Sequence, residues 1–308
     1  MNILITGVNG FVGSNLVKDF KLKHNIYGLD IVTSAVGGII ETYSWDNLDV
    51  LPAVDVVIHL AGMAHDTKNL THSEKYFDIN TGLTQKIFDW FLQSEAKKFI
   101  HFSSVKAVAD KVLADKLTED VIPNPVGPYG MSKLAAEKYI LDAKADKLVY
   151  ILRPCMIHGP GNKGNLNLLY NFVLKGIPYP LGKFENKRSF TSIDNLSYIV
   201  ERLIENNIQS GVYNIADDEA ISTNELITLI ANTANKPVRI WKFSPWLIRF
   251  AANTGACLHF TKNKDRIDKL TANFIVSNKK IKDALKIDKM PVDPVDGLKK
   301  TILSFNHK

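Results

Sequence analysis

The chain begins with a short apolar run that passes straight into a glycine-rich turn, Ile3-Leu4-Ile5-Thr6-Gly7-Val8-Asn9-Gly10-Phe11-Val12-Gly13. The run predicts a buried strand, and the pattern from Phe11 to Leu22 predicts a helix. Free backbone amides and the dipole at the start of a helix favour phosphate groups. We therefore expect the turn to bind a dinucleotide through Gly7, Asn9, Gly10, Phe11, Val12 and Gly13. Its Gly-x-x-Gly-x-x-Gly spacing departs from the best-known fingerprint, and the alternative is an ordinary strand–turn–helix joint.

Strand and helix patterns alternate through the first half of the chain. The candidates are strands at Ile3–Thr6, Ile26–Asp30, Val56–Leu60, Lys98–Ser103 and Leu148–Leu152, and helices at Phe11–Leu22, Glu74–Gln93 and Tyr129–Ala145. This alternation predicts an α/β fold with a Rossmann-type, doubly wound parallel sheet. The dinucleotide-binding domain is expected at residues 1–160. Residues 161–308 are expected to form mainly a smaller C-terminal α/β lobe for the substrate, with later segments returning to the first domain.

The second half has fewer regular patterns. A helix is predicted at Leu166–Gly176 and a strand at Val212–Ala216. Ser222 is predicted to cap a helix that begins at Thr223, because Glu225 stands where a capping box requires an acid.

Asp30 ends the second predicted strand, where an acid can hydrogen-bond the ribose hydroxyls of adenosine. Its charge would repel a 2′-phosphate, so NAD is favoured over NADP as the cofactor. Asp46 could reach the adenine amino group, although a loop aspartate is more often only solvated. Both acids are therefore predicted cofactor contacts.

Two further segments are expected near the nicotinamide. Leu60-Ala61-Gly62 ends a predicted strand, and its small residues would let the nicotinamide ribose lie close. Asn80 is expected to brace the backbone there, and an N-cap role for Asn80 is the alternative.

A tyrosine and a lysine four positions apart, Tyr129 and Lys133, share one face of a predicted helix. Tyrosine is a poor base at neutral pH. An ammonium group and the positive ring of NAD+ both favour the phenolate, which could then remove a proton from an alcohol while hydride leaves for the cofactor. A serine at the end of the strand Lys98–Ser103 should be the third partner, and strand alternation leaves Ser104 as the choice over Ser103.

Composition and charge argue against several other classes of protein. The 308 residues carry a net charge of +6, and the basic residues are scattered rather than interleaved with aromatics, so a nucleic-acid partner is not expected. Two cysteines cannot form a disulfide framework, and the sequence suggests no metal site. No apolar run is long enough to span a membrane, and no signal peptide precedes the first strand. We expect a cytoplasmic protein.

These motifs together resemble the extended short-chain dehydrogenase/reductase superfamily, specifically its NAD-dependent nucleotide-sugar epimerases, dehydratases and 4-keto reductases. The resemblance covers nearly the whole chain. It rests on Thr6–Gly13, Asp55–Gly62, Phe102–Ser104, Pro128–Lys133, Arg153-Pro154, Gly159-Pro160-Gly161, Arg188-Ser189-Phe190, Asp194-Asn195 and Tyr213-Asn214-Ile215.

The resemblance implies roles for individual residues. It implies Ser104, Tyr129 and Lys133 as the catalytic set, and it adds Pro154 to the cofactor contacts. A UDP-sugar is the implied substrate. Its implied contacts are Arg153, Asn165 and the diphosphate- and uridine-binding Arg188 and Arg266, with His65 and Lys106 near the sugar. Surface salt bridges are the alternative for Arg188 and Arg266, and solvated loops for His65 and Lys106.

One departure bears on the reaction. Related dehydratases place an Asp-Glu pair directly after the catalytic hydroxyl, whereas this chain has Val105-Lys106. This argues against dehydration and leaves a UDP-glucose or UDP-N-acetylglucosamine 4-epimerase as the first hypothesis. A UDP-4-keto-6-deoxy-N-acetylhexosamine 4-reductase using NAD(P)H is the second, and a non-catalytic dinucleotide-binding protein the third.

Relatives also pair the two helices that correspond to Glu74–Gln93 and Tyr129–Ala145 across a two-fold axis. Both helices carry an apolar outer face in this sequence. A homodimer is therefore expected.

Overall fold

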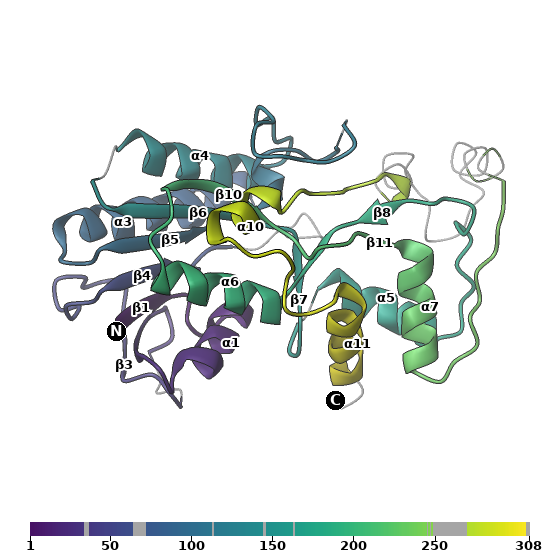
Figure 1. Ribbon diagram of the computed structural model, residues 1–308, viewed down its shortest axis with the longest axis horizontal. Coiled ribbons are helices and arrows are strands. Elements are labelled where there is room, and N and C mark those ends of the chain that lie inside the picture. Colours follow the sequence, from purple (N-terminus) through teal and green to yellow (C-terminus); the bar gives the residue numbers. More distant parts are fainter. Residues whose placement is uncertain are drawn as a thin grey trace.

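The larger part of the molecule is built on a seven-stranded parallel sheet (Figure 1). The computed structural model describes residues 1–33, 37–63, 72–112, 114–143, 146–162, 164–244, 246, 248 and 270–305. In sheet order the strands are β10 (Gly211–Ile215), β6 (Leu148–Pro154), β5 (Lys98–Phe102), β4 (Val56–His59), β1 (Asn2–Thr6), β2 (Asn25–Leu29) and β3 (Glu41–Tyr43). This confirms the predicted fold class. Within this sheet, the short edge strand β3 is the one that was not predicted.

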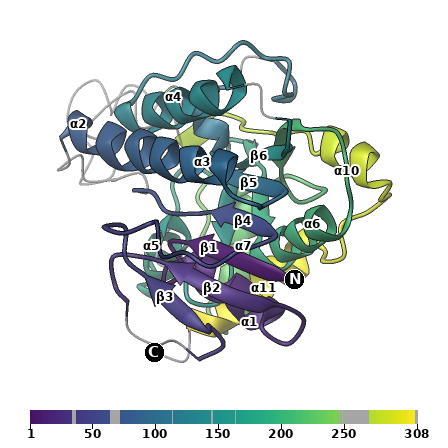
Figure 2. The ribbon, with the colours of Figure 1, turned by 90° about the vertical axis from the view of Figure 1, so that its left-hand side faces the viewer.

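Helices cover both faces of the sheet, as Figure 2 shows. On one face lie α1 (Phe11–Phe20), α6 (Ile193–Glu205) and α10 (Lys279–Leu285). On the other lie α3 (Leu83–Gln93) and α4 (Pro128–Asp142). Alternation along β1 explains the two cores, because Ile3 and Ile5 pack on the first face and Leu4 on the second.

The predicted helix Glu74–Gln93 is divided in the structure. It consists of α2 (Ser73–Tyr76), a π-helical segment η1 (Phe77–Gly82) and α3. Asn80 lies inside the π-helical segment, so the alternative N-cap role for Asn80 is wrong. A π-helical turn shifts the direction of the side chains within a helix and often occurs at functional sites.

The smaller lobe lies at the right of Figure 1 and has its own apolar core. It contains α5 (Asn165–Leu174), α7 (Thr223–Thr233) and α11 (Pro294–Phe305). Two short sheets accompany them, made by β7 (Met156–His158) with β9 (Phe190–Ser192) and by β8 (Lys187–Arg188) with β11 (Ile221–Ser222). The capping box at the start of α7 is confirmed, since Ser222 and Glu225 hydrogen-bond each other's backbone amides.

The chain passes repeatedly between the two parts. After α5, it returns to the large sheet through α6 and β10, and later through α10. These segments fall within the 161–308 range expected mainly in the substrate lobe. The cleft between the two parts is therefore lined by segments distant in sequence.

Candidate active site

A cleft of about 580 Å³ lies beyond the carboxyl ends of the central strands, where a parallel sheet binds its ligands. The predicted site residues that line it are Gly7, Gly10, Phe11, Val12, Gly13, Leu60, Gly62, Ser104, Lys106, Tyr129, Lys133, Pro154 and Arg188. Those that are described but do not line it are Asn9, Asp30, Asp46, Ala61, Asn80, Arg153 and Asn165. His65 and Arg266 lie outside the described residues.

The glycine-rich turn forms one wall of this cleft. Gly7 has φ +66°, and a Cβ there would lie 2.8 Å from the Ala61 amide nitrogen, so only glycine fits without a shift. Helix α1 begins after Gly10 with no side-chain cap and no acid in its first turn. Its first amides therefore remain available to an anionic group, which is the chemistry a diphosphate requires.

Asp30 supports the turn from beside the cleft. Its carboxylate accepts hydrogen bonds from the amides of Asn9 at 3.0 Å and Ile31 at 2.7 Å. Asp30 is buried and fixes the path of the turn, next to where the ribose was expected. By contrast, Asp46 is exposed and accepts a hydrogen bond from the Ser44 hydroxyl at 2.9 Å.

A buried polar chain that the sequence analysis missed shapes the turn after β4. The His59 ring lies 2.7 Å from the Thr6 hydroxyl and 2.9 Å from the Thr84 hydroxyl. Thr6 also accepts the amide of Ala61 at 3.0 Å. Burial, with a smaller contribution from Lys133, lowers the pKa of His59 to about 3, so the ring is neutral. No local sequence motif predicts this role of His59, because it depends on side chains from β1, β4 and α3.

Asn80 holds the backbone at the end of that turn, beside the cleft. Its side-chain oxygen accepts the Met63 amide at 2.7 Å, and its nitrogen donates to the Ser132 hydroxyl at 3.0 Å. Met63 lines the cleft and Ser132 lies in α4 between Tyr129 and Lys133. Asn80 thus links the π-helical segment to the helix that carries the tyrosine and lysine, in line with the bracing role expected.

Tyr129 and Ser104 meet in the cleft wall. Burial raises the pKa of the Tyr129 phenol, and the hydrogen bond from Ser104 opposes that rise. The Tyr76 ring lies edge-on to the Tyr129 ring at 6.2 Å. Ser103 also lines the cleft, but its hydroxyl donates to the Glu137 carboxylate. The structure therefore gives Ser104, and not Ser103, the contact with the tyrosine.

Lys133 lies one helical turn beyond Tyr129 and also lines the cleft. Its ammonium group donates to the Phe102 carbonyl at 2.9 Å. Burial lowers the pKa of Lys133 to about 8, although the nearby Glu137 carboxylate acts in the opposite direction. This lysine is therefore nearer to titration at neutral pH than an exposed lysine.

The predicted substrate contact Arg153 lies in a different environment. Its guanidinium makes a buried ion pair with the Glu137 carboxylate, with Arg153 Nε 2.9 Å from Oε1. The pair joins β6 to α4, the helix of Tyr129 and Lys133. In this structure Arg153 holds α4 against the sheet and does not line the cleft.

The opposite wall comes from the smaller lobe and is largely apolar. Arg188 in β8 is half-buried, and burial lowers its pKa. Lys106 also lines the cleft, and its ammonium lies 3.2 Å from the Asp110 carboxylate and 4.9 Å from the centre of the Phe274 ring. The lining residues that the sequence analysis did not select are Met63, Phe102, Ser103, Val105, Cys155, Met156, Ile157, Ser189, Phe190 and Phe274. Asn165 is exposed at the start of α5.

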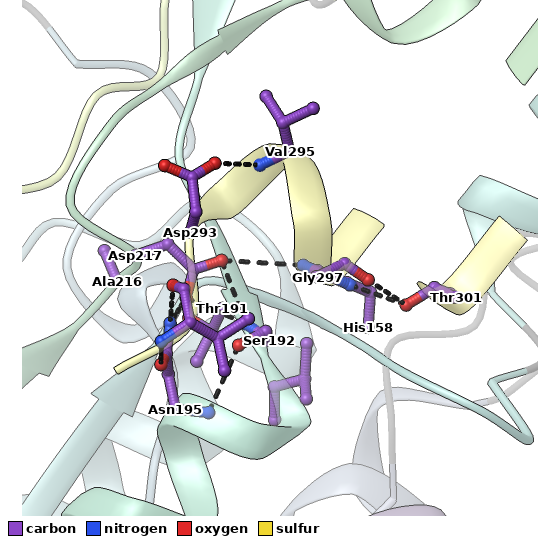
Figure 3. A network of polar contacts seen from close by, with 12 residues as sticks. His158, Thr191, Ser192, Asn195, Ala216, Asp217, Asp293, Val295, Gly297 and Thr301 are labelled. Atoms are coloured by element: carbon purple, nitrogen blue, oxygen red, sulfur yellow. Dashed lines mark hydrogen bonds and ion pairs between the residues drawn. The ribbon is translucent and has the colours of Figure 1, made fainter. Parts of the chain in front are cut away.

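A buried polar network lies between the two parts of the molecule (Figure 3). The Asp217 carboxylate accepts the amide of Ser192 at 3.0 Å and the Asn195 side chain at 2.7 Å. His158 lies 3.5 Å from the same carboxylate and 2.9 Å from the Thr301 hydroxyl in α11. The network fixes β7 and β9, which carry the cleft residues Ile157 and Phe190.

The described residues contain no group of three or more His, Cys, Asp or Glu side chains arranged to hold a metal ion. None of their helices has the length and apolar character needed to cross a membrane.

Comparison with known proteins gives consistent matches. The model of the NAD dependent epimerase/dehydratase family matches residues 3–216. A Vibrio cholerae protein named UDP-glucose 4-epimerase is 32% identical over 320 residues, which cover 99% of this chain and 95% of that protein. An Escherichia coli O157:H7 protein named N-acetyl-alpha-D-glucosaminyl-diphospho-ditrans,octacis-undecaprenol 4-epimerase is 26% identical over 251 residues, covering 77% of this chain and 73% of that protein.

A solved structure shows the same fold. The UDP-glucuronic acid 4-epimerase from Bacillus cereus, crystallised in complex with NAD, superposes with a TM-score of 0.75 at 21% identity. The match covers 100% of this chain and 99% of that chain.

Proposed function

Because the chain belongs to the NAD dependent epimerase/dehydratase family, we propose that it is a UDP-sugar 4-epimerase that works with NAD+. The observation that carries this proposal is the meeting of Ser104, Tyr129 and Lys133 in a cleft whose other end is the glycine turn. UDP-glucose or UDP-N-acetylglucosamine is the proposed substrate.

The turn fits the proposed cofactor. The amides at the start of α1 would hold its diphosphate, and Asp30, fixed by the Asn9 and Ile31 amides, would meet the adenosine ribose. A carboxylate at that position favours NAD over NADP. When bound, NAD+ supplies a hydride acceptor that can also return the hydride.

Tyr129 is the proposed base. It takes the proton of the 4-hydroxyl as hydride leaves C4, which oxidises that carbon to a ketone. The Ser104 hydroxyl donates to the phenolic oxygen and stabilises the phenolate. Since burial raises the pKa of this tyrosine, the phenolate needs additional positive charge, which Lys133 and the oxidised nicotinamide would provide. Return of the proton and hydride, after the sugar has turned, inverts C4.

The substrate's diphosphate needs a cation in the smaller lobe. Arg188 lines the cleft there, and its planar guanidinium suits phosphate oxygens. The surrounding wall is apolar, with Phe190, Met156 and Ile157. Such a wall binds the sugar with few polar contacts, so a transient ketone can rotate within the cleft.

A 4-keto reductase is the second candidate. The observation that favours it is Lys106 in the cleft wall. The Ser104-Val105-Lys106 stretch resembles a branch of the family that acts on UDP-N-acetyl-hexosamines or on their 4-keto-6-deoxy derivatives, and the latter are substrates for reduction. The same three groups would then act in one direction, with Tyr129 giving a proton to the 4-oxygen as NAD(P)H gives hydride to C4.

The test begins with the cofactor released from freshly purified protein. UDP-glucose and UDP-N-acetylglucosamine are then offered without added cofactor. Co-purified NAD+ with interconversion at C4 is the expected result. A protein that is inert until it receives a 4-keto nucleotide sugar and NAD(P)H would be a reductase, and binding of NAD+ without any turnover would leave a non-catalytic protein.

A matched variant checks the mechanism. Tyr129→Phe removes only the phenolic oxygen, so turnover should fall by about 10³-fold or more, within or above the range that is typical of a lost acid–base group. UDP-sugar binding by calorimetry should stay within a few-fold of wild type. Wild-type turnover in this variant would exclude Tyr129 as the base.

A further inference from the structure

Exposed aromatic side chains gather on the smaller lobe. Trp241 is 53% exposed, Trp246 68% and Phe243 42%. Val238 and Ile177 beside them are each 43% exposed. Aromatic side chains of this size normally bury most of their surface, so an exposed group of them marks a contact surface.

Backbone pairing holds this surface in place. The amide of Trp241 donates to the Tyr179 carbonyl at 2.8 Å, and the amide of Gly182 donates to the Trp241 carbonyl at 3.0 Å. The two segments can approach this closely because Gly182 has no side chain. A Cβ at this position would lie only 2.9 Å from the Trp241 carbonyl oxygen. Trp241 therefore lies on a paired, extended backbone, and Phe243 follows two residues later.

Strand alternation directs the side chains outward. Ile240 packs toward the core of the lobe, so its neighbours Arg239 and Trp241 face away from that core. The Trp241 and Phe243 rings share the outer face and lie edge-to-face at 5.6 Å. In Figure 1 this segment is the green stretch that follows α7 at the right-hand edge, at the end of the molecule opposite the large sheet.

The charged side chains of the two paired segments all have one sign. The paired segments 175–183 and 234–244 contain no Asp or Glu. Their five basic residues are all exposed, and they are Lys175, Lys183, Lys236, Arg239 and Lys242. Tryptophan prefers the boundary between water and lipid, and Lys and Arg are attracted to anionic headgroups.

We propose that this surface, the 175–183/234–244 face with Trp246, binds the surface of an anionic lipid bilayer. The aromatic rings would enter the headgroup region, and the basic side chains would contact lipid phosphates. The protein would then act at the membrane without crossing it. The proposal rests on this face alone and not on the proposed reaction.

Vesicle sedimentation of the full chain tests the proposal. Wild type should pellet with phosphatidylglycerol-containing vesicles at low salt, pellet little with pure phosphatidylcholine vesicles, and be released by salt. Each basic side chain near such a surface adds about fivefold to the partition coefficient, so Lys236→Glu/Lys242→Glu should lose at least about 25-fold. Lys18→Glu/Lys97→Glu, the same charge change on the sheet domain, should bind at least about fivefold more tightly than the Lys236→Glu/Lys242→Glu variant.

Tryptophan fluorescence gives an independent measurement. Vesicles should shift the emission of wild type to shorter wavelength as Trp241 and Trp246 leave water. Trp241→Ser/Trp246→Ser should lose the shift and bind more weakly, whereas Leu22→Ser, an exposed apolar residue elsewhere, should keep both. Circular dichroism and thermal melting would verify that each variant is folded.

Three results would overturn the proposal. The first is no vesicle binding at low salt. The second is binding that the Lys236→Glu/Lys242→Glu variant leaves unchanged. The third is a change in native mass of the Trp241→Ser/Trp246→Ser variant without lipid, which would assign the face to a second copy of the chain.

Discussion

At the residue scale, Lys133 shows how burial sets the chemistry of one side chain. Burial lowers its pKa to about 8 from the ordinary 10.5. Below pH 8 the lysine is charged in both the folded and the unfolded protein. Burying this charge lowers the free energy of unfolding. Between the two pKa values the unfolded protein binds more protons, so stability rises with pH.

This gives a prediction about stability and pH. The free energy of unfolding of wild type, relative to Lys133→Met, should increase between pH 7.5 and pH 10 by on the order of 2 kcal/mol. Urea unfolding of both proteins at the two pH values measures the difference. The Lys138→Met variant, on the exposed face of the same helix, should show no such trend. A constant difference between wild type and Lys133→Met would mean that the ammonium group is well solvated.

At the element scale, α4 depends on a buried ion pair for its position. Glu137 accepts hydrogen bonds from Ser103 and from Arg153, and all three side chains are buried. Glu137 lies on the same helix as Tyr129 and Lys133, so this contact helps to hold those two residues in place relative to the sheet.

Removing Glu137 should therefore be costly. Glu137→Ala leaves the Arg153 charge buried and unpaired, which should lower the free energy of unfolding by about 3–5 kcal/mol. Glu137→Gln, which keeps the hydrogen bonds to one oxygen, should lose less, and the exposed Asp142→Ala on the same helix should lose little. Equal losses for Glu137→Ala and Asp142→Ala in chemical denaturation would show that the pair does not hold the helix.

At the scale of the whole molecule, α4 leaves apolar side chains on the outside of the larger domain. On α4, Met131 is 46% exposed and Leu141 50%. Helices α3 and α4 lie side by side on one face of the sheet, as Figure 2 shows. Such a face fits pairing with the same face of a second copy, because a two-fold interface is self-complementary.

We expect a homodimer through this face. Light scattering at micromolar concentration should give twice the mass of the chain, and Leu141→Lys should shift the population toward monomer by weakening association about tenfold or more. Leu22→Lys, on a different surface, should leave the dimer intact. A wild-type protein of monomeric mass would contradict the expectation.

The sequence by itself determined the features that short stretches encode. The glycine turn after β1, the capping box at Ser222 and the helical spacing of Tyr129 and Lys133 all follow from residues within a few positions of one another. Backbone conformation and helix periodicity act over that range, so the fold class and the family could be predicted before any contact was known.

Tertiary structure alone decided the features that join distant segments. Phe274 reaches the cleft because its backbone pairs with that of Arg188. Arg153, which was expected to bind the substrate, instead forms an ion pair with Glu137. Asn80 lies within a π-helical segment and hydrogen-bonds Met63 and Ser132, which are distant from it in sequence. Buried polar groups must find partners wherever packing brings them, and a large core admits many pairings compatible with the same apolar pattern. For that reason only the folded chain shows which side chains meet at the cleft.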